Sequence, residues 1–300
     1  MNSWIILDKP VGPTSTHCVS AVKRALRAGG YARRKIGHGG TLDPLASGVL
    51  PIAIGEATKL AGRMLDADKA YDFTLSFGVE TDSLDAEGRA IATSPVRPSR
   101  AALDAVLPRF RGPIEQAPPA FSALKIDGER AYARARAGET FAIATRAVTI
   151  HALAVRAWAG ESVTFSARVS KGTYIRSLAR DIAHALGTVG HVTMLRRTKA
   201  GPFTLEKAIS LDKLEEAAKA RTLETITLPL TAGLDDIPAL PVTPDQAGAL
   251  RQGRKLIGIA ASPGLHLAID GTVPVALVES SGPELRVVRG FNLQDVEGKD

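Results

Sequence analysis

One loop constrains this chain more than any other segment, because it combines glycines with residues that can do chemistry. It runs Gly37-His38-Gly39-Gly40-Thr41-Leu42-Asp43-Pro44-Leu45-Ala46-Ser47-Gly48 and leads directly into the apolar run Val49–Ile54. A short apolar run that ends at a glycine is typical of a buried strand. A phosphate-binding P-loop would instead open a helix and carry Gly-Lys-Ser/Thr, which this loop lacks. The sequence therefore predicts an accessible loop in front of a buried strand.

Asp43 has two interpretations within this loop. Asp-Pro pairs commonly begin turns, so the pair alone favours a structural role. The surrounding glycines and the nearby His38 favour a site where a ligand approaches the backbone closely. His38, His17 and His151 lack partners at metal-ligand spacing, and Cys18 is the only cysteine. We therefore expect no metal centre and no intrachain disulfide.

Hydrophobic periodicity predicts strands and helices in the first 240 residues. The expected strands are Trp4–Leu7, Val49–Gly55, Ala70–Gly78, Ala147–Val155, Val163–Val169 and Val189–Leu195. One helix is expected after a Thr14 or Ser15 cap, with its end at Gly29-Gly30. The other expected helices are Glu56–Leu65, Ser99–Phe110, Glu129–Ala137, Thr173–Leu186 and Leu211–Ala220. The helix at Thr173 places Tyr174, Arg176 and Arg180 in or near its first turns.

Prolines and glycines punctuate the chain between Leu228 and Pro241, which is typical of a connection between domains. Beyond it we expect a helix and three short strands, with an Asp270-Gly271 turn between the first two strands. These elements are Pro244–Arg251, Leu265–Ile269, Val273–Val278 and Leu285–Val288. A length of 300 residues suits about two domains. We therefore predict domains at residues 1–238 and 239–300, the second a small all-β module.

The charge balance favours a polyanion partner without proving one. Lys and Arg number 38 against 31 Asp and Glu, a formal charge of +7. Arginine-rich segments at Arg33-Arg34, Arg130–Arg136 and Arg196-Arg197 are individually best explained as solvated faces. Together they indicate a distributed polyanion-binding surface.

The hydrophobic content of 45% and charged content of 23% are those of a folded globular protein. The apolar run Trp4–Leu7 is too short for a signal peptide, and no stretch approaches the roughly 18 apolar residues of a membrane span. We expect a cytoplasmic protein without membrane association.

Seven blocks of the sequence follow one another in a recognisable order. They are Leu7-Asp8-Lys9-Pro10-Val11-Gly12, the Gly37–Pro51 loop, Gly55-Glu56-Ala57-Thr58-Lys59, Lys69-Ala70-Tyr71, Phe121-Ser122-Ala123-Leu124-Lys125, Lys171-Gly172-Thr173-Tyr174-Ile175-Arg176 and Leu195-Arg196-Arg197-Thr198. Together they closely resemble the TruB family of bacterial tRNA pseudouridine synthases. The resemblance covers nearly the whole predicted first domain. The segment after Leu240 matches more loosely and resembles the family's RNA-binding PUA module.

The resemblance implies the pseudouridine synthase fold. This is an α+β domain with a long, mostly antiparallel mixed sheet flanked by helices and a cleft across its middle, followed by a small all-β PUA-like domain. It also implies an enzyme that flips one uridine of the tRNA T-loop, at position 55, into a pocket and isomerises it to pseudouridine. The reaction is redox-neutral and transfers no group, so no cofactor is expected. The implied partner is the tRNA T-arm, bound by a monomer that needs no protein partner.

The resemblance assigns catalytic roles to three residues. Asp43 corresponds to the essential carboxylate, which either attacks the anomeric carbon or removes a sugar proton to give a glycal. The sequence leaves both routes open. Arg176 corresponds to the cation that pairs with this carboxylate. Tyr71 corresponds to a tyrosine that stacks on the base and is a candidate acceptor of the C5 proton.

Five more residues correspond to substrate-binding positions of the family. Tyr174 and Leu195 would line the pocket, and His38 would fill the gap left by the flipped nucleotide. Lys9 and Lys59 would support the site or contact the RNA backbone.

Two other functions remain open at this point. The same chemistry could serve ribosomal or another RNA, or the chain could be a non-catalytic RNA chaperone. Asp43 counts against the chaperone, because an ionised carboxylate beside phosphates gains nothing electrostatically.

Overall fold

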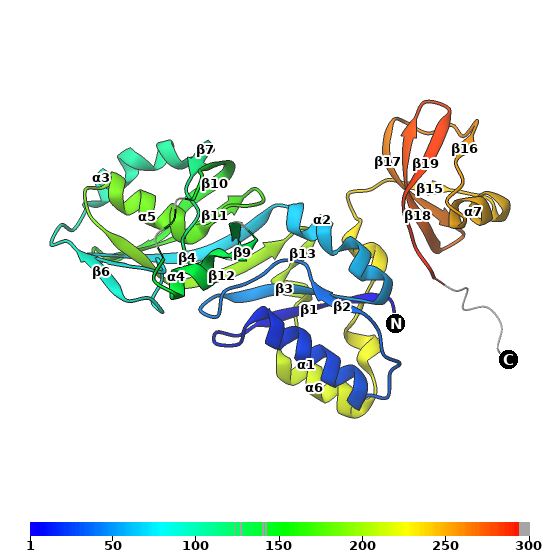
Figure 1. The fold of residues 1–300 in the computed structure, drawn as a ribbon, viewed down its shortest axis with the longest axis horizontal. Helices are drawn as coiled ribbons and strands as arrows, with labels where there is room; N and C mark the ends of the chain where they lie inside the picture. The colour runs from blue at the N-terminus through cyan, green and yellow to red at the C-terminus, as the bar shows by residue number, and fades with distance from the viewer. Residues whose placement is uncertain (123, 127, 140, 142, 294–300) are drawn as a thin grey trace.

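The structure is a computed structural model that describes residues 1–122, 124–126, 128–139, 141 and 143–293. Ala123 of the Phe121–Lys125 block lies outside the described residues, as do residues 294–300 of the predicted second domain. The described chain forms an elongated body with a smaller β module at one end (Figure 1). None of its helices has the length and apolar character needed to cross a bilayer.

The body is built on a ten-stranded mixed sheet (Figure 1). The strands in spatial order are β14 (Leu228–Pro229), β1 (Ser3–Lys9), β3 (Ser47–Ile54), β12 (Gly190–Ala200), β4 (Lys69–Phe77), β11 (Ser162–Val169), β10 (Arg146–Trp158) and β7 (Gly112–Gln116), with β2 (Ile36–His38) on β3 and β13 (Phe203–Thr204) on β12. Neighbouring strands are antiparallel except β3 and β12, which run parallel. The predicted α+β fold with a long, mostly antiparallel sheet is confirmed.

The parallel contact between β3 and β12 lies in the middle of the sheet and depends on a glycine. It pairs Ser47 with Arg196 and Gly48 with Arg197. Gly48 has a φ of +103°, and a Cβ added there would lie 2.2 Å from the main-chain oxygen of Arg197. Only glycine fits such a close approach between two backbones. The loop that carries Asp43 is therefore joined tightly to β12.

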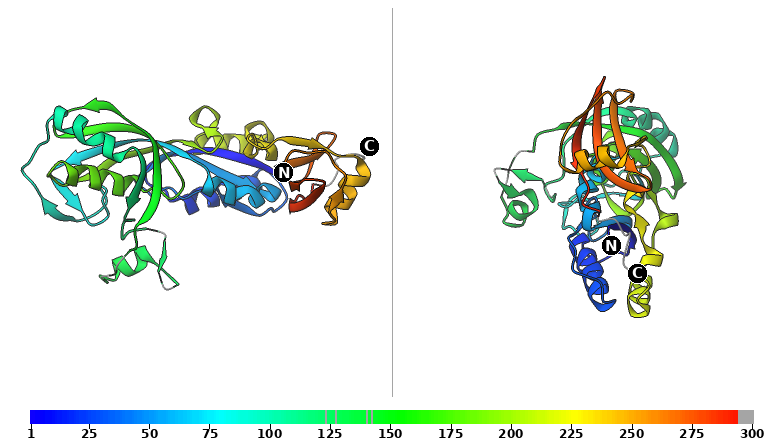
Figure 2. Two further views of the ribbon diagram at one scale, coloured as in Figure 1. Left: turned by 90° about the horizontal axis from the view of Figure 1, so that it is seen from above. Right: turned by 90° about the vertical axis from the view of Figure 1, so that its right-hand side faces the viewer.

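Helices flank this sheet. They are α1 (Ser15–Ala28), α2 (Ala61–Asp66) after a 3₁₀ turn at Gly55–Leu60, α3 (Arg100–Val106) followed by a 3₁₀ turn at Leu107–Phe110, α5 (Ile175–Ala185) and α6 (Leu211–Ala220). Another helix, α4 (Ala131–Arg136), projects away from the sheet (Figure 2). In α1, Thr14 accepts a hydrogen bond from the His17 N–H, so Thr14 is the cap. The α1 side chains Val22 and Leu26 are buried in the core that α1 shares with α6.

Helix α5 begins two residues later than the periodicity predicts, because the chain before it is held extended. The side chain of Gln116 accepts from the Tyr174 N–H at 2.8 Å and donates to the Tyr174 carbonyl at 3.1 Å. Tyr174 thereby becomes the N-cap, and Ile175 starts the helix. Helix α4 also starts late, because Glu129 and Arg130 form the short strand β9 with β8 (Lys125–Ile126). A second short hairpin, β5 (Val79–Thr81) with β6 (Ala90–Thr93), was not predicted either.

The terminal module is a five-stranded sheet with one helix, α7 (Pro244–Arg251). Its strands in spatial order are β15 (Ala239–Pro241), β17 (Gly264–Asp270), β18 (Val273–Ser281), β19 (Glu284–Gly290) and β16 (Leu256–Ile257). Asp270 pairs with Val273, so the turn between β17 and β18 is Gly271-Thr272, one residue later than predicted. The module has a hydrophobic core of its own. On this ground we propose that it is a separate domain.

A hydrophobic cluster joins the module to the main sheet. Phe291, which is 2% exposed, follows β19 and lies in the same cluster as Trp4, Ala57 and Leu60 of the body. Two polar contacts flank it, because Lys59 donates to the Gly290 carbonyl and Glu56 accepts from the Asn292 N–H. The module is thus attached through packing as well as through the chain.

Candidate active site

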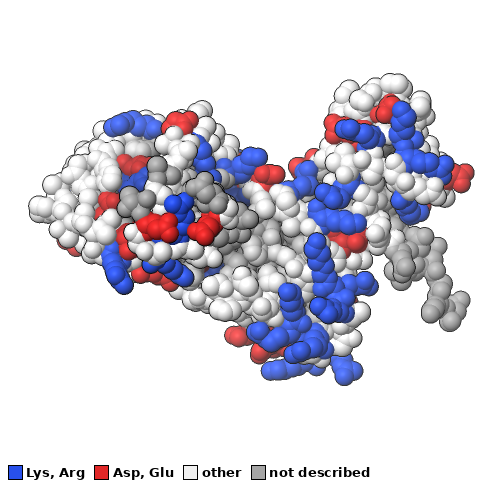
Figure 3. Space-filling model, viewed as in Figure 1, with Lys and Arg blue, Asp and Glu red and all other residues white. Residues whose placement is uncertain are grey.

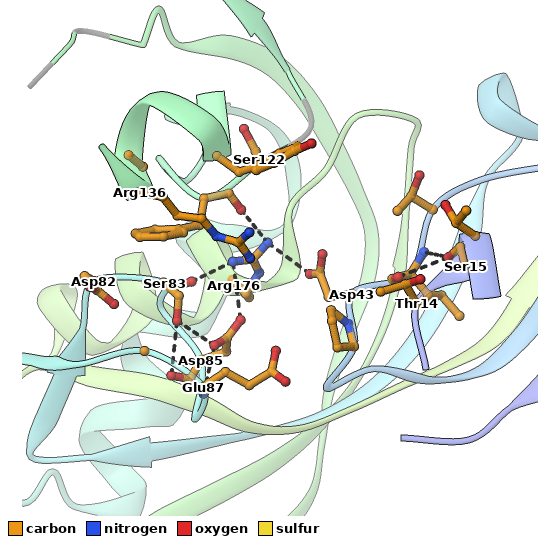
Figure 4. Close-up of a pocket in the computed structure, with 18 of the residues that line it drawn as sticks. Thr14, Ser15, Asp43, Asp82, Ser83, Asp85, Glu87, Ser122, Arg136 and Arg176 are labelled. Carbon is orange, nitrogen blue, oxygen red and sulfur yellow. Dashed lines mark hydrogen bonds and ion pairs between the residues drawn. The ribbon is translucent and has the colours of Figure 1, made fainter. Parts of the chain in front are cut away.

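Two adjoining cavities meet at Asp43 and Arg176. The larger, of about 1020 Å³, is lined by the start of α1, the turn after β5 and the segment around α4 (Figure 4). The smaller, of about 290 Å³, is lined by residues of β4, β12 and the start of α5. Both side chains line both cavities.

Asp43 and Arg176 form an ion pair, although they are 133 positions apart in the sequence. Arg176 Nη2 lies 3.0 Å from Asp43 Oδ2, and Figure 4 shows the two groups pointing toward each other. The Arg176 side chain is 5% exposed, whereas that of Asp43 is 37% exposed. The guanidinium is therefore buried, and the carboxylate presents a free side to the cavities.

Arg176 has a second carboxylate partner, Asp85, which the sequence analysis missed. Arg176 Nη1 lies 3.3 Å from Asp85 Oδ2, and the Asp85 side chain is 4% exposed. Asp85 Oδ1 accepts from the Ser83 hydroxyl and from the Glu87 N–H. Arg176 also donates to the carbonyls of Ser83 and Phe121 at 2.7 and 2.9 Å. The guanidinium is consequently locked between two acidic groups and two carbonyls.

The position of Asp85 is set by a turn that docks on β12. The main chains of Leu84 and Ala86 exchange hydrogen bonds with Val192 of that strand. In the sequence the stretch from Thr81 to Gly88 predicts only an acidic turn after the Ala70–Gly78 strand. The one available signal was an aspartate among residues that favour turns, and no spacing rule links it to a helix 91 positions away.

The Asp43 loop is held by buried side chains from beneath. Ser15 accepts from the Leu42 N–H at 2.8 Å and donates to the Leu42 carbonyl at 3.1 Å. Arg197, which is 1% exposed, donates to the carbonyls of Gly40, Thr41 and Val49. Such contacts satisfy loop carbonyls that would otherwise be buried without partners.

The prediction that Arg196-Arg197 is a solvated face was therefore wrong. Arg197 is buried, because the loop offers its guanidinium three carbonyl acceptors. Arg196 is partly buried and pairs with Asp8 on β1 at 2.7 Å. Both arginines hold the centre of the sheet together.

Lys9 also lies under this loop, at the end of β1. Its ammonium donates to the carbonyls of Pro10 at 2.8 Å and Pro44 at 3.2 Å, and the residue is 0% exposed. Burial lowers the pKa of Lys9, an effect that nearby acidic groups including Asp43 only partly offset. The structure thus places Lys9 where it supports the loop.

Tyr71, Tyr174 and Leu195 line the smaller cavity together with Asp43. Tyr71 is partly buried on β4, and Leu195 on β12 pairs in register with Phe73. The guanidinium of Arg146 lies 4.8 Å from the centre of the Tyr174 ring, and it also donates to the Gly172 carbonyl. The cavity therefore combines aromatic and aliphatic surface with one carboxylate.

His38 lies apart from these three residues, in the lining of the larger cavity. Its Nδ1 accepts from the Gly40 N–H at 3.4 Å. Burial and the charge of Arg197 lower the pKa of His38, which keeps the imidazole neutral at pH 7. A neutral ring of this kind can stack or donate without adding charge.

Lys69 lines the smaller cavity and was not predicted as a site residue. It is 8% exposed and donates to the carbonyls of Leu65 and Ala67, both at 2.6 Å. Burial, together with repulsion from Arg197, lowers the pKa of Lys69 to about 8. The Lys69-Ala70-Tyr71 block was the signal that could have identified it.

Lys59 lines neither cavity. Its ammonium contacts Glu56 at 2.7 Å and the Gly290 carbonyl at 2.9 Å, so it bridges the body and the terminal module. A contact between Lys59 and the RNA backbone stays a prediction. Of the other histidines, His17 is exposed, and His151 lies 3.1 Å from Asp68. No group of three His, Cys, Asp or Glu side chains in the described chain is arranged to hold a metal ion.

Comparisons with known proteins agree with this geometry. Residues 27–175 match the TruB family pseudouridylate synthase N-terminal domain, and residues 176–235 match the tRNA pseudouridylate synthase B C-terminal domain. The chain is 62% identical to tRNA pseudouridine synthase B of Novosphingobium aromaticivorans, over 99% of both chains. It is 62% identical to the protein of that name from Zymomonas mobilis, over 97% of this chain and 96% of the relative.

Solved structures with the same fold come from RNA-protein particles. A structure of an H/ACA RNP bound to a substrate RNA containing 2′-deoxyuridine gives a TM-score of 0.74 at 25% identity, covering 98% of this chain and 86% of the other. The archaeal box H/ACA sRNP Nop10-Cbf5 complex gives the same score and identity, with 98% and 87% covered. From the sequence matches and the shared fold, we conclude that this chain belongs to the TruB family of pseudouridylate synthases.

Proposed function

We propose that this pseudouridylate synthase acts on tRNA and isomerises the uridine at position 55 of the T-loop. The observation that carries the proposal is the buried Arg176 held against the partly exposed Asp43 at the mouth of a small, partly aromatic cavity. The relatives at 62% identity, both named tRNA pseudouridine synthase B, support tRNA as the substrate.

The smaller cavity suits a nucleobase that has left its stack. Its volume of about 290 Å³ lies at the lower end of the range for small-molecule sites. Tyr71, Tyr174 and Leu195 offer faces that can replace the stacking which the flipped base loses. The base would therefore enter beside Asp43, with its ribose toward the carboxylate.

Asp43 is the group that breaks the bond between N1 of the base and C1′ of the ribose. It does so either by attack on C1′ or by removal of a sugar proton, and both routes need an ionised carboxylate. Arg176 pairs with this carboxylate at 3.0 Å, and Asp85 on its other side keeps the guanidinium from turning away. The exposed side of Asp43 is left free for the ribose.

The second half of the reaction joins C1′ to C5 of the rotated uracil. The C5 proton must then leave, and N1 must gain a proton, so the product is an isomer of the substrate. Tyr71 lies in the cavity and is the candidate acceptor of the C5 proton. No atom is exchanged with a second substrate.

The remaining parts of the proposal concern partners and place of action. We propose that a monomer binds the T-arm without a protein partner and acts in the cytoplasm, where a bacterial tRNA is found. His38 would fill the gap left by the flipped nucleotide, since it lies in the lining of the adjoining cavity. Ribosomal RNA is the alternative substrate.

The test is a quantitative pseudouridine assay on an unmodified tRNA T-arm. Wild type is compared with Asp43→Asn and with Asp104→Asn, a matched change at an exposed aspartate of α3. RNA binding is confirmed for all three proteins first. We expect conversion at position 55 by wild type and Asp104→Asn, and none by Asp43→Asn. Binding without conversion by wild type would refute tRNA as the substrate, and ribosomal RNA would be assayed next.

A further inference from the structure

The positive charge of this chain is concentrated in one segment. From Lys9 to Leu42 the sequence contains seven Lys and Arg residues and no Asp or Glu. The formal charge of the whole chain is +7, so the rest of the sequence is neutral in sum. The segment runs from the end of β1 through α1 and β2 to the loop before Asp43.

Six of these seven residues form an exposed surface, which we call the α1 basic surface. Its members are Lys23, Arg24, Arg27, Arg33, Arg34 and Lys35. Within the described chain, none of these six side chains makes a hydrogen bond or an ion pair. On the neighbouring α6, by contrast, Lys213 and Lys219 each lie beside a glutamate. A helix dipole accounts only for Arg27, which is in the last turn of α1.

The segment that carries this surface reaches the larger cavity near both of its ends. Thr14, Ser15 and Thr16 at the start of α1 line that cavity, and so does His38 after the basic stretch. At 1.5 Å per residue, Lys23 lies roughly 12 Å along the helix from Ser15. Lys and Arg side chains gather over α1 and the following chain in Figure 3, and Figure 2 shows α1 on the same side of the sheet as α4.

The backbone under the surface is fixed. The Tyr31 hydroxyl donates to Glu224 at 2.5 Å and accepts from the Leu223 N–H, which ties the chain to the 3₁₀ turn that follows α6. The Lys35 carbonyl accepts from the Gly55 N–H at 2.8 Å, and β2 pairs with β3 directly afterwards. These cations are unpaired and stand on a fixed backbone whose neighbouring residues line the cavity, so they suit a polyanion that also has a defined shape.

We propose that the α1 basic surface binds the sugar-phosphate backbone of the RNA whose uridine occupies the cavity. This rests on the proposed function, because it takes the substrate to be RNA. Contacts between Lys or Arg and phosphate release counterions, so they add affinity that falls as salt rises. They do not act on the reacting atoms, so they leave turnover at saturating RNA unchanged.

Two triple variants test the proposal. One is Lys23→Gln/Arg24→Gln/Arg27→Gln, and the other is Arg33→Gln/Arg34→Gln/Lys35→Gln. The matched control, Lys207→Gln/Lys213→Gln/Lys219→Gln, removes the same charge on and just before α6. Affinity for an unmodified tRNA transcript is measured from about 50 to 200 mM salt in the Asp43→Asn background, where no product forms. KM and kcat are measured with Asp43 intact.

We expect each surface variant to weaken binding at least about tenfold at low salt and to lower the salt slope by about two to three. KM should rise while kcat stays within about twofold of wild type, and the control should keep the wild-type slope. Unchanged slopes in the surface variants, or an equal loss in the control, would overturn the proposal. If wild type binds RNA but forms no pseudouridine, the proposed function is refuted. The proposal for the α1 basic surface would still be tested by the salt slopes of binding.

Discussion

Two buried arginines hold the two halves of the site, and they use different partners. Arg197 on β12 donates to three main-chain carbonyls of the Asp43 loop and its strand. Arg176 on α5 contacts two carboxylates as well as two carbonyls. The first arginine therefore fixes the shape of the loop, and the second fixes where negative charge lies. A site that must orient an ionised carboxylate needs a loop of fixed shape to place it. It also needs a cation beside it, because a carboxylate without a partner is costly to bury.

The largest effect on stability is expected from Arg176→Gln. It leaves Asp85 buried without a cation, which should lower the free energy of unfolding by about 3 to 5 kcal/mol. Chemical denaturation measures this loss. The double variant Arg176→Gln/Asp85→Asn removes the stranded charge and should recover part of it. A double variant no more stable than the single one would show that Asp85 carries no such charge.

A change at Gly48 should act on the half of the site that Arg197 shapes. Gly48→Ala places a Cβ 2.2 Å from the Arg197 carbonyl oxygen at a φ of +103°, so we expect a loss of at least about 2 kcal/mol in the free energy of unfolding. Gly160→Ala is the matched control, because its φ is +75° and nothing lies near the added Cβ. The control should lose only about 1 kcal/mol. Equal losses would mean that the close approach to β12 is unimportant.

A smaller effect is expected in the pH dependence of stability, through Lys69 near Arg197. Burial and Arg197 lower the pKa of Lys69 to about 8, whereas the unfolded chain keeps the ordinary value of 10.5. Between these values the unfolded chain binds more protons, so the contribution of Lys69 to stability increases as pH rises. Relative to Lys69→Met, wild type should gain about 1 to 2 kcal/mol from about pH 7 to pH 9.5. Urea denaturation at both pH values measures the difference in free energy of unfolding between wild type and Lys69→Met. A difference that stayed constant or fell as pH rose would contradict this prediction.

Elements with local signals were well predicted from the sequence. Helices α6 and α7 match their predicted bounds to the residue, because Ser210 and Thr243 cap them through their side chains. Helix α5 was predicted too long, since Gln116 on a distant strand holds Tyr174 extended. A cap can be predicted from neighbouring residues, whereas a tertiary contact such as that of Gln116 with Tyr174 cannot.

In the candidate site, too, contacts between residues far apart in the sequence could not be predicted from local signals. The placement of Asp43 with Arg176 came from the resemblance and not from any spacing in the chain. Asp85 and the buried role of Arg197 were missed, because charged residues are solvated by default and their partners lie far along the sequence. Only the register of β12 against β3 and the turn after β5 brings these groups together.

The most direct test of the role of Arg176 between its two carboxylates is the single-turnover rate of Arg176→Lys on unmodified tRNA. It is measured at saturating enzyme, together with the dissociation constant. Lysine keeps the charge but lacks the fork that reaches both Asp43 and Asp85. We predict a rate at least about a hundredfold below wild type, with affinity within about threefold. A rate within about twofold of wild type would show that a single positive charge suffices and that the bridge between the two carboxylates is not needed.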